Sequence, residues 1–139
     1  MRLISQHDNS YILRLEQGEE FVSAIENFCN ENKIHSAWLE ALGSSKDLEL
    51  AFYELEKRQY KTERFAGPME ILTITGNISK KENTAFCHAH GIFGRPDMTT
   101  LGGHINRCII SATCEVVLRV GDKELRREFD EETGLHLLG

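Results

Sequence analysis

The stretch EEFVSAIENFCNENK, residues 19–33, decides the fold class, because it has the clearest helical period in the chain. Its apolar stripe, at positions i, i+4, i+7 and i+8, consists of Phe21, Ile25, Phe28 and Cys29. Glu19 and Glu20 stand at the expected N-terminal turn and Lys33 at the end, each with the charge that the helix dipole favours. The sequence therefore predicts one amphipathic helix.

On both sides of this helix the apolar period changes to two, which is the period of a strand. YILRLE, residues 11–16, begins as a short strand before the helix, and LELAFYEL, residues 48–55, sets Leu48, Leu50 and Phe52 on one face after it. The other segments with strand character are YKTERF (60–65), MEILTITGNI (69–78), TAFCHAHGIF (84–93), RCIISATCEVVLRVG (107–121) and KELRREF (123–129). Most of the chain is therefore expected to form a sheet.

Four dipeptides have the composition of turns between these strands: Gly67-Pro68, Gly76-Asn77, Gly102-Gly103 and Gly121-Asp122. IHSAWLEALGS, residues 34–44, fits a helical stripe as well as a strand, and its position after a complete helix favours the strand. One early helix followed by hairpin-connected strands predicts an α+β fold, with a mostly antiparallel β-sheet and a flanking α-helix. A chain of 139 residues is expected to form a single domain, residues 1–139.

The net charge and the cysteines indicate which partners and which cellular compartment are expected for this domain. A net charge of −6 disfavours non-specific attraction to nucleic acid, and the basic segments 56–64 and 123–128 are interleaved with acidic residues. The chain has no run of eighteen apolar residues and no signal-peptide pattern near its start, so we expect a cytoplasmic protein without a membrane span. Cys29, Cys87, Cys108 and Cys114 lack CxxC spacing and are expected to be buried, free thiols.

Three of the six histidines have the spacing of metal ligands. On a strand, His88 and His90 point to the same side with Cα atoms roughly 6 to 7 Å apart, close enough for both rings to reach one ion. Gly102-Gly103 before His104 would allow a sharp turn or a close approach, which makes His104 the expected third ligand. Three imidazoles with an open fourth position favour zinc, while cobalt, nickel, copper and iron remain alternatives. His7, His35 and His136 have no such companions.

A catalytic site is not identifiable from the residues. Glu70, Glu115 and Asp97 are candidate general bases for a metal-bound water, and Glu115 is expected to pair with a basic neighbour. The chain contains no Ser/His/Asp order, Walker loop or GxGxxG motif, so the catalytic residues, if any, remain unknown.

The chain resembles the Plants and Prokaryotes Conserved domain family, in its stand-alone prokaryotic form, over about Tyr11 to Leu137. The resemblance rests on four phrases in order: LEQGEEFVSAIENFCNENKIHSAWLEALGS (15–44), GPMEILTITGNIS (67–79), CHAHGIFG (87–94) and LGGHINRCIISATCEVVL (101–118). It implies an α+β domain that assembles as a homotrimer, and the family's histidine pattern falls on His88, His90 and His104. In plant members the domain follows an AT-hook, so stand-alone members are often labelled DNA-binding by association.

An AT-hook requires an Arg-Gly-Arg-Pro core in a basic setting. FGRPDM, residues 93–98, has Phe93 in place of the first arginine and Asp97 after the proline, so we interpret it as a turn.

These observations leave three hypotheses about function. The first is a trimeric, metal-binding cytoplasmic protein with zinc as the leading ion and an undefined biochemical role, for example as a small-ligand or protein-interaction module. The second is a DNA-associated regulator, which the net charge disfavours. The third is a metal-dependent enzyme of unknown substrate. A further hypothesis is that the metal site lies close to a subunit boundary, where a neighbouring chain supplies or shields the fourth position.

Overall fold

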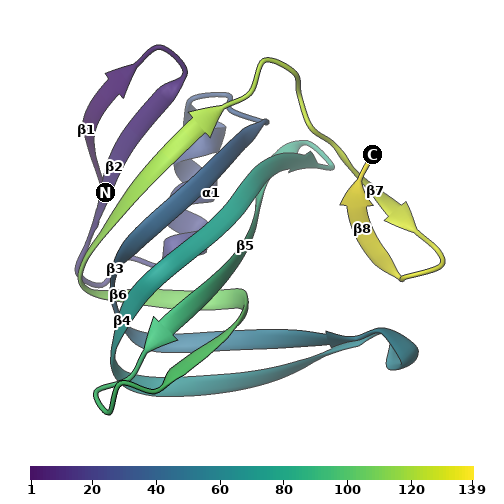
Figure 1. The fold of residues 1–139 in the computed structure, drawn as a ribbon. Coiled ribbons are helices and arrows are strands. Elements are labelled where there is room, and N and C mark those ends of the chain that lie inside the picture. The colour runs from purple at the N-terminus through teal and green to yellow at the C-terminus, as the bar shows by residue number, and fades with distance from the viewer.

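The computed structural model describes all residues, 1–139, and consists of one antiparallel sheet, one α-helix and a small C-terminal hairpin (Figure 1). The elements are β1 (Arg2–His7), β2 (Ser10–Glu16), α1 (Phe21–Glu31), β3 (Ala37–Glu54), the 3₁₀ turn η1 (Leu55–Lys57), β4 (Gln59–Lys81), β5 (Thr84–Gly94), β6 (Thr100–Val120), β7 (Arg127–Asp130) and β8 (Leu135–Leu138). The main sheet has the order β1-β2-β6-β3-β4-β5, and β7 pairs with β8. The predicted α+β class is confirmed.

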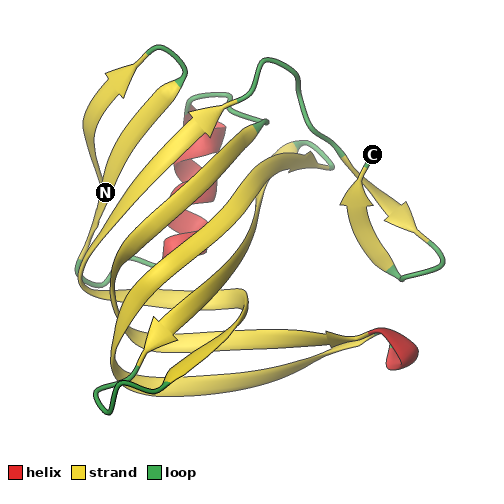
Figure 2. Cartoon of the chain, viewed as in Figure 1, coloured by secondary structure: helices red, strands yellow, loops and turns green.

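Helix α1 lies against one face of the sheet, as Figure 2 shows with the helix in red. Its N-cap is Glu20, whose carboxylate accepts hydrogen bonds from the backbone N–H groups of Val22 (3.2 Å) and Ser23 (2.8 Å). The same carboxylate accepts a third bond, of 3.0 Å, from the N–H of Cys108 in β6. The cap therefore joins the helix to the sheet.

The two other charges predicted at the helix ends lie outside it. Glu19 precedes the cap and binds the N-terminal amino group of Met1, and Lys33 follows the C-cap Asn32 with a φ of 56°. Lys33 is therefore at the end of the helix as predicted, whereas Glu19 does not lie in the first turn, and that part of the prediction is wrong.

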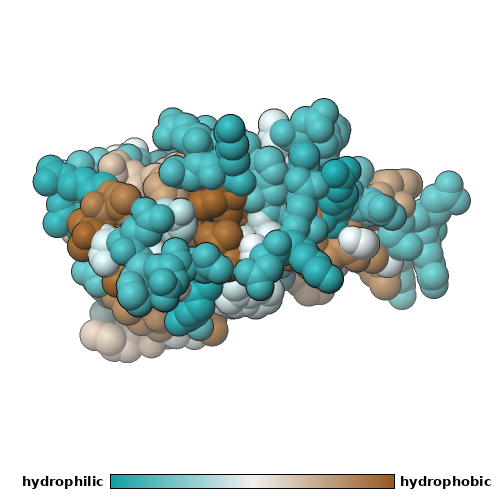
Figure 3. Space-filling view, turned by 90° about the horizontal axis from the view of Figure 1, so that it is seen from above, coloured by the Kyte–Doolittle hydropathy of each residue, from teal (hydrophilic) through white to brown (hydrophobic).

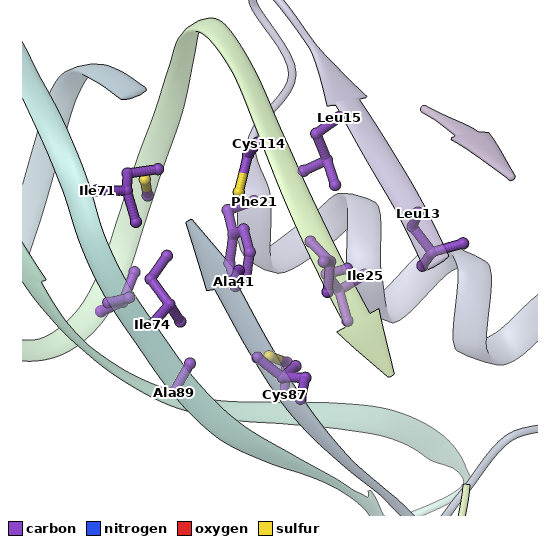
Figure 4. Close-up of a cluster of buried hydrophobic side chains, with 14 of the residues drawn as sticks. Leu13, Leu15, Phe21, Ile25, Ala41, Ile71, Ile74, Cys87, Ala89 and Cys114 are labelled. Atoms are coloured by element: carbon purple, nitrogen blue, oxygen red, sulfur yellow. The ribbon is translucent and has the colours of Figure 1, made fainter. Parts of the chain in front are cut away.

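The predicted stripe of α1 belongs to the hydrophobic core, and Figure 4 shows Phe21 and Ile25 of this stripe among side chains of the sheet. Phe21, Ile25 and Cys29 are fully buried, and they pack with sheet residues such as Leu13 and Ile74. Burying one side chain of this size contributes about 1.5 to 3 kcal/mol to folding. One cluster of 26 buried residues spans the helix and the sheet, so a single core holds the fold together.

All four cysteines are buried and free, as predicted. Burial raises the pKa of Cys29, Cys108 and Cys114 to about 12, so these thiols remain protonated at neutral pH. They act as small apolar side chains of the core.

Strands β3, β4 and β6 are much longer than the segments predicted for them, with 18, 23 and 21 residues. Each bends and continues, because the ladders of β3 with β6 and with β4 both shift register near Gly43 and Ser45. Strand β6 pairs with β2 and β3 and also, through its first residues, with β5. Strands β6, β3, β4 and β5 therefore close into a ring, and β5 lies beside the start of β6.

Three of the four predicted turns lie inside strands. Gly67-Pro68 and Gly76-Asn77 belong to β4, and Gly102-Gly103 belongs to β6; only Gly121-Asp122 lies in a loop. Gly76 is needed because a Cβ there would lie 2.5 Å from the carbonyl oxygen of His88 on β5. Gly102 and Gly103 likewise permit close approach of neighbouring backbones, whereas Gly67 has open space around it and a φ of 109°, which favours glycine. The prediction of a turn was wrong at all three pairs.

Two further segments differ in extent from their predictions. Residues 34–44 are not helical: β3 begins at Ala37, which confirms the strand. KELRREF becomes a strand only from Arg127, while the residues before it run beside the end of β4, where the N–H of Lys80 donates to the carbonyl of Leu125 (2.7 Å). This pairing brings the segment before β7 to the edge of the main sheet.

The surface is mostly hydrophilic with scattered apolar areas, as the teal and brown atoms of Figure 3 show on the face seen from above. No helix has the length and apolar character that crossing a bilayer requires.

Candidate metal centre

Strand β5 presents His88 and His90 on one face, as its alternating sequence predicts. Ala85, Cys87 and Ala89 are buried on the opposite face, where they contribute to the core. Hydrophobic burial of every second residue therefore fixes which way the two imidazoles point.

His104 reaches the same place from β6. It lies within the strand, not on a turn, and is the direct cross-strand partner of His90. The glycines before it permit this pairing: a Cβ at Gly102 would lie 2.9 Å from the carbonyl oxygen of Gly91. The prediction that His104 joins the pair is consistent with the structure, and the close approach is the reason, while the proposed turn is wrong.

The three rings form a compact cluster. Their centroids are separated by 5.1 Å (His88 to His90), 5.1 Å (His88 to His104) and 5.3 Å (His90 to His104). One ring nitrogen of each residue lies within 4.8 Å of the corresponding nitrogen of both others. Nδ1 of His104 is buried and has no hydrogen-bond partner in the chain. A buried nitrogen without a partner is costly, and a bound cation would satisfy it, so the donor set fits a metal ion.

The electrostatics of the cluster favour neutral rings. Burial lowers the pKa of His88 to about 4, with smaller contributions from the charges of Arg127, His104 and His90. Burial also lowers the pKa of His104, followed by the effects of His90 and Arg127. Neutral imidazole has the lone pair that a metal requires, so His88 and His104 are ready to bind one at neutral pH.

The depressed pKa of His88 predicts acid sensitivity of the metal-free protein. The unfolded chain takes up this proton near the ordinary value of 6.5 and the folded chain only near 4, so stability present above pH 6.5 is lost between these values. Because the ring is only half-buried, we expect a discounted loss of about 1 to 2 kcal/mol. Urea unfolding in chelator at pH 7.5 and 4.5 measures it, and a His88→Gln variant should lose less; an equal loss in both proteins would contradict the assignment.

None of the other histidines joins the cluster, although His136 lines the same cavity as His88 and His104. His7 is exposed beside Asp8, and His35 contacts Glu124 at 3.4 Å. His136 lies on β8, where its ring is 5.4 Å from that of Phe129.

None of the three acidic candidates for a general base joins the cluster either. Glu70 and Glu115 are exposed on β4 and β6, and Asp97 accepts hydrogen bonds from Thr99 in the turn after β5. Glu115 lies directly opposite Arg14 of β2, so it has a basic neighbour as predicted, but Arg14 forms its ion pair with Glu16 instead. The turn itself, at Gly94-Arg95-Pro96, is confirmed by the hydrogen bond from Arg95 N–H to the carbonyl of Thr99 (2.8 Å).

Sequence reasoning missed the residues around the cluster. Tyr60 of β4 lies with its ring 5.4 Å from that of His104, and Arg127 at the start of β7 is close enough to lower the pKa values of His88 and His104. Arg127 follows Arg126 in a segment of mixed charge, and such a sequence is typical of a solvent-exposed strand end. No pattern in the neighbouring sequence distinguishes Arg126 from Arg127. Their surroundings differ only because of the path that the chain takes beside β4.

The fold and the cluster together define a class of protein: an α+β domain built on a long-stranded antiparallel sheet that carries three converging histidines. The model of the Plants and Prokaryotes Conserved domain matches residues 3–121, and the chain belongs to this family. Comparison with curated proteins gives no significant match.

Solved structures of similar proteins share the fold over nearly the whole chain. A candidate DNA-binding protein from Bacteroides thetaiotaomicron is 29% identical, with a TM-score of 0.93 over 97% of this chain and 94% of that one. A plant- and prokaryote-conserved protein from Pyrococcus horikoshii is 28% identical, with a TM-score of 0.89 over 95% and 92%. A metal-containing protein from Archaeoglobus fulgidus is 33% identical, with a TM-score of 0.88 over 99% and 98%.

Proposed function

We propose that this protein binds one divalent transition-metal ion per chain, with zinc as the first candidate, through His88, His90 and His104. The observation that carries the proposal is the buried, unpartnered Nδ1 of His104 within a cluster whose three donor nitrogens lie within 4.8 Å of one another. The similarity to the metal-containing protein of Archaeoglobus fulgidus, at 33% identity, supports it.

The donor set determines which ions suit the site and what they can do. Three neutral imidazoles suit zinc and the neighbouring transition metals and leave at least one coordination position open. A bound ion would act there as a Lewis acid toward a small ligand. No carboxylate lies in the cluster to serve as a general base, so we favour a ligand-binding role over a hydrolytic one.

We also propose that the protein functions as a homotrimer in the cytoplasm. Leu42, Leu72 and Ile92, on the neighbouring strands β3, β4 and β5, are 57%, 52% and 48% exposed, and the Met98 side chain beyond β5 is 87% exposed. Apolar side chains gathered on adjacent strands suit contact with another copy of the chain. A neighbouring subunit could then shield the metal or complete its coordination, and light scattering in solution measures the number of chains.

A DNA-associated role is the second candidate, because the similar protein of Bacteroides thetaiotaomicron is described as a candidate DNA-binding protein. The net charge of −6 opposes it. Filter binding over a salt titration separates the two roles, since phosphate contacts give an affinity that falls steeply with salt. Absence of binding at low salt would remove this candidate.

Elemental analysis of the purified protein tests the metal proposal. We expect about one transition-metal ion per chain, and after removal by chelator we expect uptake of the same amount of zinc. Zinc should also raise the unfolding temperature of the metal-free protein, since an ion that binds only the folded state stabilises it. A metal-free protein that takes up no zinc, cobalt or nickel would contradict the proposal.

A further inference from the structure

A cavity of about 310 Å³ opens beside the histidine cluster, between the main sheet and the β7–β8 hairpin. Its polar walls are Tyr60, Lys81, His88, His104, Arg127 and His136, and its apolar walls include Phe86, Leu135 and Leu137. No acidic side chain lines it, although the chain has 22 acidic and 16 basic residues. This cavity therefore concentrates positive charge within an acidic protein.

Arg127 is fixed at the edge of this cavity by neutral groups only. Its Nε donates to Oγ of Ser79 (2.9 Å), its Nη2 to Oδ1 of Asn77 (3.0 Å) and its Nη1 to the carbonyl oxygen of His136 (2.8 Å). Ser79 and Asn77 are themselves buried. A guanidinium has five N–H donors, so one N–H on each terminal nitrogen remains free. These two donors remain available to an anion such as a carboxylate, which arginine binds with charge-assisted hydrogen bonds.

The second cation of the cavity is also without a counter-charge. The Nζ of Lys81 lies 5.4 Å from the centroid of the Phe86 ring, and the guanidinium of Arg127 lies 5.1 Å from it. Neither residue forms an ion pair, whereas their sequence neighbours Lys80 and Arg126 both pair with Glu124, at 3.1 and 2.7 Å. A partly buried cation without an anion is unfavourable, and the metal proposed next to it would add two more positive charges.

We infer that this cavity binds a small organic acid, whose carboxylate is held by Arg127 next to the open position of the metal. The inference rests on the proposed metal site. The volume lies at the lower end of the range for small-molecule pockets, which suits a molecule of a few carbon atoms. The apolar walls favour an organic acid over inorganic phosphate, which has no apolar part to bury.

Cobalt-loaded protein tests this inference, because the visible absorption of cobalt responds to a change in its ligands. Addition of L-lactate should produce a saturable change in the spectrum, whereas lactamide, its neutral counterpart, should produce none at equal concentration. Cobalt uptake is measured first by elemental analysis. No uptake would overturn the metal site, while uptake without any response to lactate or pyruvate would overturn only the organic-acid site.

Two arginine variants test whether Arg127 binds the carboxylate of the organic acid. Arg127→Gln should retain cobalt and bind lactate about tenfold more weakly or worse, since it removes charged hydrogen bonds to the ligand. Arg126→Gln, which alters the adjacent ion-paired arginine, should bind lactate like the native chain. Equal lactate affinity in both variants would contradict the role of Arg127, and so would a stronger response to phosphate than to lactate in the native protein.

Arg127 also satisfies the buried Ser79 and Asn77, so its replacement could affect folding. Lys81→Gln provides an independent variant, because the Lys81 ammonium contacts only the face of Phe86. We expect it to weaken lactate binding about two- to fivefold by removing one nearby charge. If Arg127→Gln does not fold, unchanged lactate affinity in Lys81→Gln together with a response to lactamide would reject the site.

Discussion

A His88→Ala/His90→Ala variant should purify with less than about a tenth of the metal bound by the native chain. The reason is that the double change leaves His104 as a single ligand, and one imidazole does not retain a transition metal through purification. Elemental analysis of the native and variant proteins, prepared together, measures the difference. Equal metal content in the two proteins would show that the ion is held elsewhere.

The matched control is His7→Ala, which removes an exposed histidine on the β1–β2 hairpin, far in sequence from the cluster. It should retain the full metal content. The double variant should keep its fold, because His90 is exposed and His88 only half-buried, on the face of β5 that points away from the core. Circular dichroism of both variants separates loss of the site from loss of the structure.

Gly43→Ala should destabilise the protein by about 3 kcal/mol or more. A Cβ at Gly43 would lie 2.2 Å from the carbonyl oxygen of Thr113 and 2.7 Å from Cα of Cys114, both in the backbone of β6. Flexible side chains could move aside, but these atoms belong to the ladder that joins β3 to β6 where both strands bend. The methyl group can be accommodated only if the two strands separate, so the midpoint of urea unfolding should fall sharply.

Gly94→Ala is the matched control for this prediction. Its Cβ would meet only the side chain of Leu72, at an ordinary contact distance of 3.4 Å. The free energy of unfolding should then change by less than about 1 kcal/mol. Similar stability of the two variants would mean that β3 and β6 do not approach at Gly43 as the structure has them.

Much of the architecture was predictable because it depends on local periods. The four-residue stripe of α1 and the alternation along β5 each follow from neighbouring residues in the sequence, and they correctly placed Phe21 in the core and His88 beside His90. The glycine pairs were misjudged for the opposite reason. Glycine permits both a turn and a close backbone contact, and its sequence neighbours do not say which one the fold uses.

The surroundings of the histidines were not predictable. Arg126 and Arg127 are adjacent and chemically identical, yet one pairs with Glu124 and the other lies at the cavity beside His88. The difference arises because the chain after β6 runs along the end of β4, so that alternate side chains face solvent and the cavity. That path is a property of contacts between residues far apart in the sequence.

The amino-acid sequence by itself determined the α+β class, the burial of the cysteines and the common face of His88 and His90, because apolar periodicity acts over a few residues. Only the tertiary structure decided that His104 lies opposite His90 within a strand and that an unpaired arginine stands next to the cluster. The physical reason is that strand register and the closure of the sheet into a ring depend on the whole sheet, because β6 must form hydrogen bonds with β2, β3 and β5 at once.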